Sequence, residues 1–176
     1  MLNSKEISTI MCLPSTGDMV NIANVRSTPT RLRQKFFPGM RTISRSQLEK
    51  VIEAALKNDC PEMNCPANEV VSLLVLYIFT TILFPNTGGS VPMHLFGYVE
   101  NLDRLNSYNW GGAVFDMLAM HIPNAALWCQ LQESDESVES EGSESGYLSG
   151  CALALIVRYL AQLFFFIFHY RLIIMF

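Results

Sequence analysis

The chain has 176 residues, which is enough for one domain of ordinary size, and half of its residues are hydrophobic. Its formal net charge of −4 argues against a strong nucleic-acid binder, because such domains usually carry a marked positive charge. The charge is unevenly placed, however: eight of the twelve basic residues lie between Arg26 and Lys57, and six acidic residues lie between Glu133 and Glu144.

The N-terminal third is expected to be irregular over residues 1–43, because prolines and glycines recur along it and leave room only for short elements. The first twenty residues contain no apolar segment typical of a secretory signal. The five cysteines of the whole chain are odd in number and irregularly spaced, which fits reduced intracellular thiols.

Residues 44–59 carry the first strong helix signal. Ser44 or Ser46 can cap this helix, and Glu49 follows Ser46 by three residues, as in a capping box. Apolar residues recur at the i, i+3 and i+4 spacing of one buried face, namely Leu48, Val51, Ile52, Ala55 and Leu56.

A long apolar run follows, with Asn68 as the expected N-cap and Glu69 in the first turn, where a negative charge suits the helix dipole. From Val70 to Phe84 no residue is charged. These fifteen residues span about 22 Å as a helix, whereas a bilayer core is about 30 Å thick. The length favours a buried central helix over a membrane span.

The stretch FPNTGGSVP, residues 84–92, resembles in position a phosphate-binding loop, because two glycines stand between an apolar run and a predicted helix. A Walker loop would also need a lysine directly after its last glycine, and the nearest lysine is Lys57. The glycine spacing of a dinucleotide-binding loop is absent as well. The composition instead favours a turn.

Two further helices are expected after this turn, one over residues 91–105 and one that Ser107 or Asn109 caps.

Residues 131–146 are rich in serine, glutamate and glycine and are predicted to form a disordered acidic linker. Residues 147–176 are intensely apolar and are predicted to form a helix. Within them, residues 149–168 are long enough to span a membrane, although Arg158 would lie near the middle of the span.

The sequence contains no set of residues with the spacing of a catalytic or metal-binding site. Cys60 and Cys65 have the spacing of a zinc half-site, but His94 and His121 do not supply a second half. No histidine stands in a local pattern with a nucleophile and an orienting acid. We therefore predict no enzyme, no catalytic residue, no metal and no cofactor.

The basic segment TRLRQKFFPGMR is the strongest candidate for a binding function. Arg31, Arg33, Lys35 and Arg41 accompany two phenylalanines, a mixture that can grip phosphates and stack on bases. The interpretation that we favour is a solvated basic face whose phenylalanines enter the core. In the alternative interpretation, the four basic residues are nucleic-acid contacts.

Several motifs resemble the plant mobile domain, a family also labelled aminotransferase-like and found in plant transposable elements. LPSTGDMV, residues 13–20, is similar to its Leu-Pro-x-x-Gly-x-x-Val element. The segment from FFPGMRTISRSQLEKVI through the Phe-Pro turn to YNWGGAVFDML is similar to its helical centre and has the same order of motifs. The resemblance covers about residues 10–130, and GYLSGCALALIV resembles a following segment of the family.

The resemblance implies a mainly helical, non-enzymatic domain that acts as an interaction or nucleic-acid-associated module, with the nucleus as its favoured location. It implies no transaminase activity, because neither a large α/β fold nor a pyridoxal phosphate lysine is visible. The partner stays unidentified, and a protein or nucleic acid is expected. The alternative is a small integral membrane protein with its span at residues 149–168.

The predicted architecture is mainly α. It has an irregular basic segment at 1–43, an antiparallel helical core at 44–130, the acidic linker at 131–146 and the apolar helix at 147–176. After about Val157 the sequence departs from the family and resembles the translation of a T-rich intron. This suggests read-through in the gene model of a truncated element, a hypothesis that transcript sequencing across codons 155–165 tests.

Overall fold

The computed structural model describes residues 3–22, 30–57, 66–86, 88–133, 155–157 and 159. The described chain is mainly helical, which confirms the predicted fold class. In chain order the elements are α1 (Ser4–Met11), α2 (Arg31–Phe36), α3 (Arg45–Lys57), α4 (Ala67–Ile78), the π-helix η1 (Phe79–Leu83), α5 (Leu95–Val99), the 3-10 helix η2 (Leu102–Ser107) and α6 (Trp110–Glu133).

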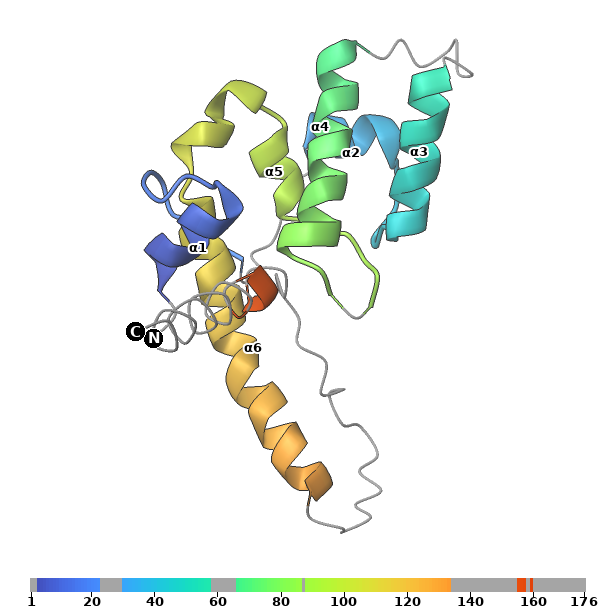
Figure 1. Cartoon of the computed structure of the whole chain (residues 1–176). Coiled ribbons are helices and arrows are strands. Elements are labelled where there is room, and N and C mark those ends of the chain that lie inside the picture. The colour runs from blue at the N-terminus through green and yellow to red at the C-terminus, as the bar shows by residue number, and fades with distance from the viewer. Residues whose placement is uncertain are drawn as a thin grey trace, which may run out of the picture.

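The helices form two packed groups (Figure 1). In one group α3 and α4 lie side by side and run in opposite directions, with α2 beside them. In the other, α1 packs across the first turns of α6, whose later turns extend away from the remaining helices. Helix α5 contacts α4 and leads through η2 to α6, so that it connects the two groups. A single cluster of buried side chains runs from Ile7 in α1 to Leu118 in α6.

Residues 1–43, expected to be irregular with room only for short elements, contain the two short helices α1 and α2 in their described part. The Asn3 side chain accepts a hydrogen bond from the backbone N–H of Glu6, and the Glu6 carboxylate accepts one from the backbone N–H of Asn3. This capping box compensates for the short length of α1. Thr30 caps α2 in the same way, by accepting from Arg33 N–H at 3.3 Å. Both helices therefore begin at capped residues, and prolines and glycines separate them.

The caps of the two central helices agree with the prediction only in part: Ser44, one of the two expected caps, does cap α3. The capping box of α3 joins Ser44 to Gln47 rather than Ser46 to Glu49: Gln47 N–H donates to Ser44 Oγ at 3.2 Å, and Ser44 N–H donates to Gln47 Oε1 at 2.8 Å. Helix α4 begins at Ala67 after Pro66, without a side-chain cap, so Asn68 is not its N-cap. Asn109 does cap α6, since its Oδ1 accepts from Gly112 N–H at 2.7 Å.

The helix expected over residues 91–105 is divided into α5 and η2. Asn101 takes an extended conformation between them, and its side chain accepts a hydrogen bond from Asp103 N–H. The chain can then turn before α6 begins.

The apolar run from Val70 to Phe84 forms α4 and continues as η1, where Phe84 N–H donates to the carbonyl of Phe79 at 2.7 Å. One side of this element is buried, through residues such as Leu73 and Leu76, which are fully enclosed. The expectation of a central helix is thus correct for one face, whereas the opposite face is open to solvent.

The predictions for the C-terminal region fall largely outside the described residues. Helix α6 continues to Glu133, so the first residues of the predicted linker at 131–146 are helical. The rest of that linker, and all of residues 147–176 except 155–157 and 159, are not described. In the described ranges, none of the helices combines the length and the apolar character that crossing a membrane requires.

Candidate functional site

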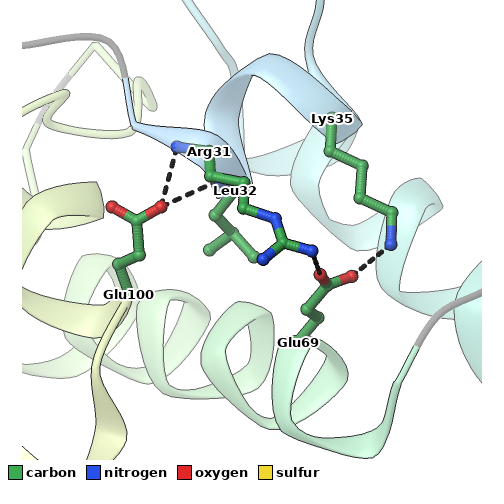
Figure 2. Close-up of polar contacts among 5 residues, drawn as sticks. All are labelled: Arg31, Leu32, Lys35, Glu69 and Glu100. Atoms are coloured by element: carbon green, nitrogen blue, oxygen red, sulfur yellow. Dashed lines mark hydrogen bonds and ion pairs between the residues drawn. The ribbon is translucent and has the colours of Figure 1, made fainter.

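The predicted nucleic-acid contacts Arg31 and Lys35 lie on α2, where they share one carboxylate (Figure 2). Glu69, in the first turn of α4, forms an ion pair with Lys35 and a longer one with Arg31, with 3.8 Å between Nη2 and Oε1. The Glu69 side chain is only 16% exposed, whereas that of Arg31 is 84% exposed. Glu69 therefore offsets positive charge that the sequence alone assigns to a nucleic-acid surface.

A second carboxylate holds the start of α2. Glu100 Oε1 accepts hydrogen bonds from the backbone N–H groups of Arg31, at 2.7 Å, and Leu32, at 3.3 Å (Figure 2). These N–H groups belong to the first turn, which has no partners within the helix. Glu100 follows α5, so this contact fixes α2 against a segment almost seventy positions further along the chain.

The other two predicted contacts do not join this carboxylate, although Arg33 also lies on α2. Arg33 donates from Nη2 to the carbonyl of Met40, seven residues further along the chain, at 2.9 Å. Arg41 is exposed and lines a cleft. The other three basic residues do not line this cleft. The structure thus brings Arg31 and Lys35 together around Glu69 but does not gather all four residues into one basic surface.

The cleft beside Arg41, which we call the His94 cleft, has a volume of about 410 Å³. This size lies within the range of small-ligand sites in proteins, roughly 300–1,000 Å³. Its lining is mostly apolar, with one arginine and a few neutral polar groups, and the described lining contains no carboxylate. The lining residues are Ile22, Arg41, Thr42, Phe84, Asn86, Ser90, Val91, Pro92, Met93, His94 and Met117.

The positive charge of the His94 cleft comes from Arg41. His94 is half-buried directly before α5, and burial lowers its pKa below the usual value of 6.5 because the charged imidazolium loses solvation. The imidazole is therefore neutral at neutral pH, while the guanidinium of Arg41 stays charged. The cleft combines an apolar floor with a single cation and suits an anionic group attached to an apolar body.

The FPNTGGSVP stretch forms a wall of this cleft as a turn, as predicted. Asn86 Oδ1 accepts from Ser90 N–H at 3.1 Å, and its Nδ2 donates to the Ser90 carbonyl at 2.8 Å. Gly89 supplies the positive φ of 60° that the turn requires.

In the described part of this turn, the backbone N–H groups of Gly89, Ser90 and Val91 are engaged within the protein. Gly89 N–H donates to the Asn86 carbonyl, and Val91 N–H donates to the Ile43 carbonyl. A phosphate-binding loop would instead present such donors to its ligand. The turn is also held to α3, because Arg45 donates from Nη2 to the Asn86 carbonyl at 2.7 Å and from its backbone N–H to the Gly89 carbonyl at 2.8 Å. The geometry therefore supports a structural role for the glycines.

The remaining chemical candidates do not meet at one site in the described part of the chain. Arg104, which does not line the His94 cleft, pairs with Asp18 at 3.3 Å. No group of three or more His, Cys, Asp or Glu side chains is placed to hold a metal ion among the residues that are described. Cys60 and Cys65, the predicted zinc half-site, lie outside those residues.

Sequence reasoning did not predict the exposed apolar row on α4 and η1. Four side chains on one face are open to solvent: Val71 (43% exposed), Leu74 (36%), Ile78 (48%) and Ile82 (42%). We call this set the α4 row. The run is apolar on every side, so its sequence carries no signal of which face stays open.

Comparison with protein families gives one match: the profile of a domain of unknown function (DUF8566) matches residues 1–156. The chain belongs to the DUF8566 family. The match includes the whole buried cluster, the His94 cleft and the α4 row, and it ends before most of the apolar tail. Among curated proteins and solved structures, no match was found.

Proposed function

We propose that this DUF8566 protein is a non-enzymatic, transposon-derived interaction module similar to the plant mobile domain, and that its His94 cleft binds an acidic peptide segment. The observation that carries the proposal is that Arg41 lines the same cleft as the apolar side chains of Phe84, Met93 and Met117. A peptide with a carboxylate next to a large apolar side chain complements both features.

The similarity to the plant mobile domain is supported by contacts between two of the motifs that carry it. The backbone N–H of Gly111, in the Tyr-Asn-Trp-Gly motif, donates to the carbonyl of Pro14, in the Leu-Pro-x-x-Gly motif, at 3.0 Å. The backbone carbonyl of Asp18, in the same Leu-Pro-x-x-Gly-x-x-Val motif, accepts from Asn109 N–H at 2.9 Å. The motifs thus contain residues that the fold needs for packing, as expected of markers of a common fold.

A peptide is favoured over a nucleic acid because of the surroundings of the basic residues. Glu69 offsets the charges of Arg31 and Lys35, and Arg33 is engaged with a backbone carbonyl. A nucleic-acid surface gains its affinity from several cations that contact successive phosphates. A single exposed arginine over an apolar cleft is better matched to one carboxylate.

The experiment is a selection of short random peptides, displayed on phage, against the full-length chain. We expect enrichment of peptides that place Asp, Glu or the C-terminal carboxylate beside Leu, Phe or Met. Arg41→Gln is expected to weaken binding of an enriched peptide about tenfold, which corresponds to one charge-assisted hydrogen bond. Lys50→Gln, which removes an exposed charge on α3, is the matched control and should leave binding unchanged.

Methionine methyl NMR locates the bound peptide. The signals of Met93 and Met117, which line the His94 cleft, should shift on addition of the peptide, while that of the exposed Met19 should not. Absence of enrichment, or binding that Arg41→Gln leaves intact, contradicts the proposal. Binding of duplex DNA that is lost when Arg31, Arg33, Lys35 and Arg41 are all replaced by alanine would favour the nucleic-acid function instead.

A further inference from the structure

The α4 row is an apolar surface that runs along α4 and continues onto η1. Its members recur at intervals of three and four residues, the spacing by which one helix face packs against another. From Val71 to Ile82 the row extends about 16 Å at about 1.5 Å per residue. Four adjacent half-exposed aliphatic side chains form a contiguous patch, which marks interaction surfaces more often than isolated exposed residues do.

The face that carries the row contains no charge, since every residue from Val70 to Phe84 is uncharged. Two copies of such a face can therefore approach each other without like-charge repulsion. Helix α3, which packs beside α4, presents exposed residues of both signs, including Lys50 and Glu53. In a two-fold contact the same surface meets itself, so exposed charges of both signs on the neighbouring helix allow unlike charges to pair.

We propose that the α4 row is a self-association surface, through which two copies of this chain form a two-fold symmetric dimer. Val71, Leu74, Ile78 and Ile82 of each copy pack against the same residues of the other. This contact lies on the exposed face of α4 and does not depend on peptide binding in the His94 cleft.

A second copy is a better occupant than the apolar C-terminal segment of the same chain. The DUF8566 match contains the whole row but ends at residue 156, so the apolar residues beyond it are not part of the family domain that carries the row. Leu155, which is described, is partly buried and packs against the buried cluster. The row therefore needs a partner that the domain itself can supply.

The row is small compared with the roughly 800 Å² that each partner buries in a standard interface, so the dimer should be weak. We expect a dissociation constant on the order of 10–100 μM. In sedimentation equilibrium, the average mass of the full-length chain should rise from 19.8 kDa toward twice that value as its concentration increases through this range.

Leu74→Glu is the decisive variant, because it places a charge in the middle of each apposed row. It should keep the chain monomeric and weaken association at least tenfold. Met120→Glu, which changes an exposed apolar residue on α6, is the matched control and should associate as the parent does. Both positions are exposed, so the urea midpoints should stay close to that of the parent; if Leu74→Glu unfolds, Ile78→Lys replaces it.

Three outcomes overturn the proposal. The parent can stay monomeric at all concentrations. It can form a dimer that persists in Leu74→Glu and Ile78→Lys, which would assign association to another part of the chain, such as the apolar tail. It can also stay monomeric and bind phosphatidylcholine vesicles in a manner that Leu74→Glu abolishes, which would identify a lipid surface as the occupant of the row.

Discussion

Individual residues stabilise this fold mainly where they hold distant segments together. Locally, the buried Trp110 fixes the turn from η2 into α6, because its indole N–H donates to the carbonyl of Leu105 at 2.7 Å. Gly17 has a φ of 121°, and its backbone lies against that of Ser107. Next to it, Asp18 N–H donates to the Ser107 carbonyl at 2.8 Å. The start of the chain is thus fixed to the segment before α6 by single residues.

Gly17→Ala is expected to destabilise the protein by about 3 kcal/mol. The added Cβ would lie 2.1 Å from the carbonyl oxygen of Ser107, and the φ of 121° is strained for any residue with a side chain. Gly97→Ala is the matched control: its Cβ would meet nothing within 4 Å, and in α5 alanine should stabilise by about 0.5–1 kcal/mol. Urea unfolding of both variants measures the difference, and equal midpoints would contradict the assignment.

His94 should make the stability of the protein depend on pH. Its pKa in the folded protein lies below 6.5 because burial disfavours the imidazolium, so the unfolded chain binds a proton first as the pH falls. The contribution of neutral His94 is therefore fully present above about pH 6.5 and is lost as the pH falls through the lower pKa of the folded state.

His94→Gln should reduce this pH dependence, and the test compares urea midpoints at about pH 7.5 and about pH 5. The parent should lose more stability over this interval than the variant does. Met120→Gln, which changes an exposed side chain on α6 and removes no titratable group, is the control and should keep the pH dependence of the parent. A parent and a His94→Gln protein with the same pH dependence would show that this imidazole is not the titrating group.

At the scale of elements, the shortest helices depend most on partners far along the chain. Helix α2 has six residues, too few to be stable alone. Its first turn is held by Thr30 and Glu100, and its basic face by Glu69. Leu32 and Phe36 can therefore pack in the core although their segment has little helical stability of its own.

Replacement of Glu100 tests this dependence. Glu100→Ala should destabilise the protein by about 1–2 kcal/mol, because two N–H groups of the first turn lose their acceptor. Glu100→Gln keeps an acceptor oxygen but loses the charge that favours a helix N-terminus, so it should cost about half as much. Asp116→Ala, an exposed acid on α6, should change stability by less than about 0.5 kcal/mol. Equal unfolding free energies for Glu100→Ala and the parent would show that Thr30 alone is sufficient.

At the scale of the whole molecule, the features that were predicted correctly from the sequence are those that depend on local patterns. The positions of α3 and α4 follow from apolar periodicity, and Asn109 and the turn at residues 84–92 follow from local hydrogen-bonding chemistry. The α2 contacts and the His94 cleft were missed for a physical reason. Glu100 and Arg31 are far apart in sequence, as are Arg41 and Met117, and only tertiary packing brings each pair together.

The buried cluster also determines which parts of the chain are needed for folding. It runs from Ile7, which is fully enclosed, to Leu118. Beyond residue 133 the structure describes only residues 155–157 and 159, and among these Leu155 packs against the cluster. Among the described residues, the cluster therefore lies within the segment that ends with α6, apart from the contact of Leu155.

A chain of residues 1–133 should consequently keep a cooperative urea transition, with a loss of about 1 kcal/mol from the missing contact of Leu155. Removal of residues 1–11 should cost at least about 3 kcal/mol, because it deletes Ile7 and uncovers the face of α6 that α1 packs against. The two truncations are compared by circular dichroism during urea unfolding. A gradual transition for residues 1–133 would mean that the fold requires the residues after α6, whereas a sharp transition near that of the full chain places the folding unit between α1 and α6.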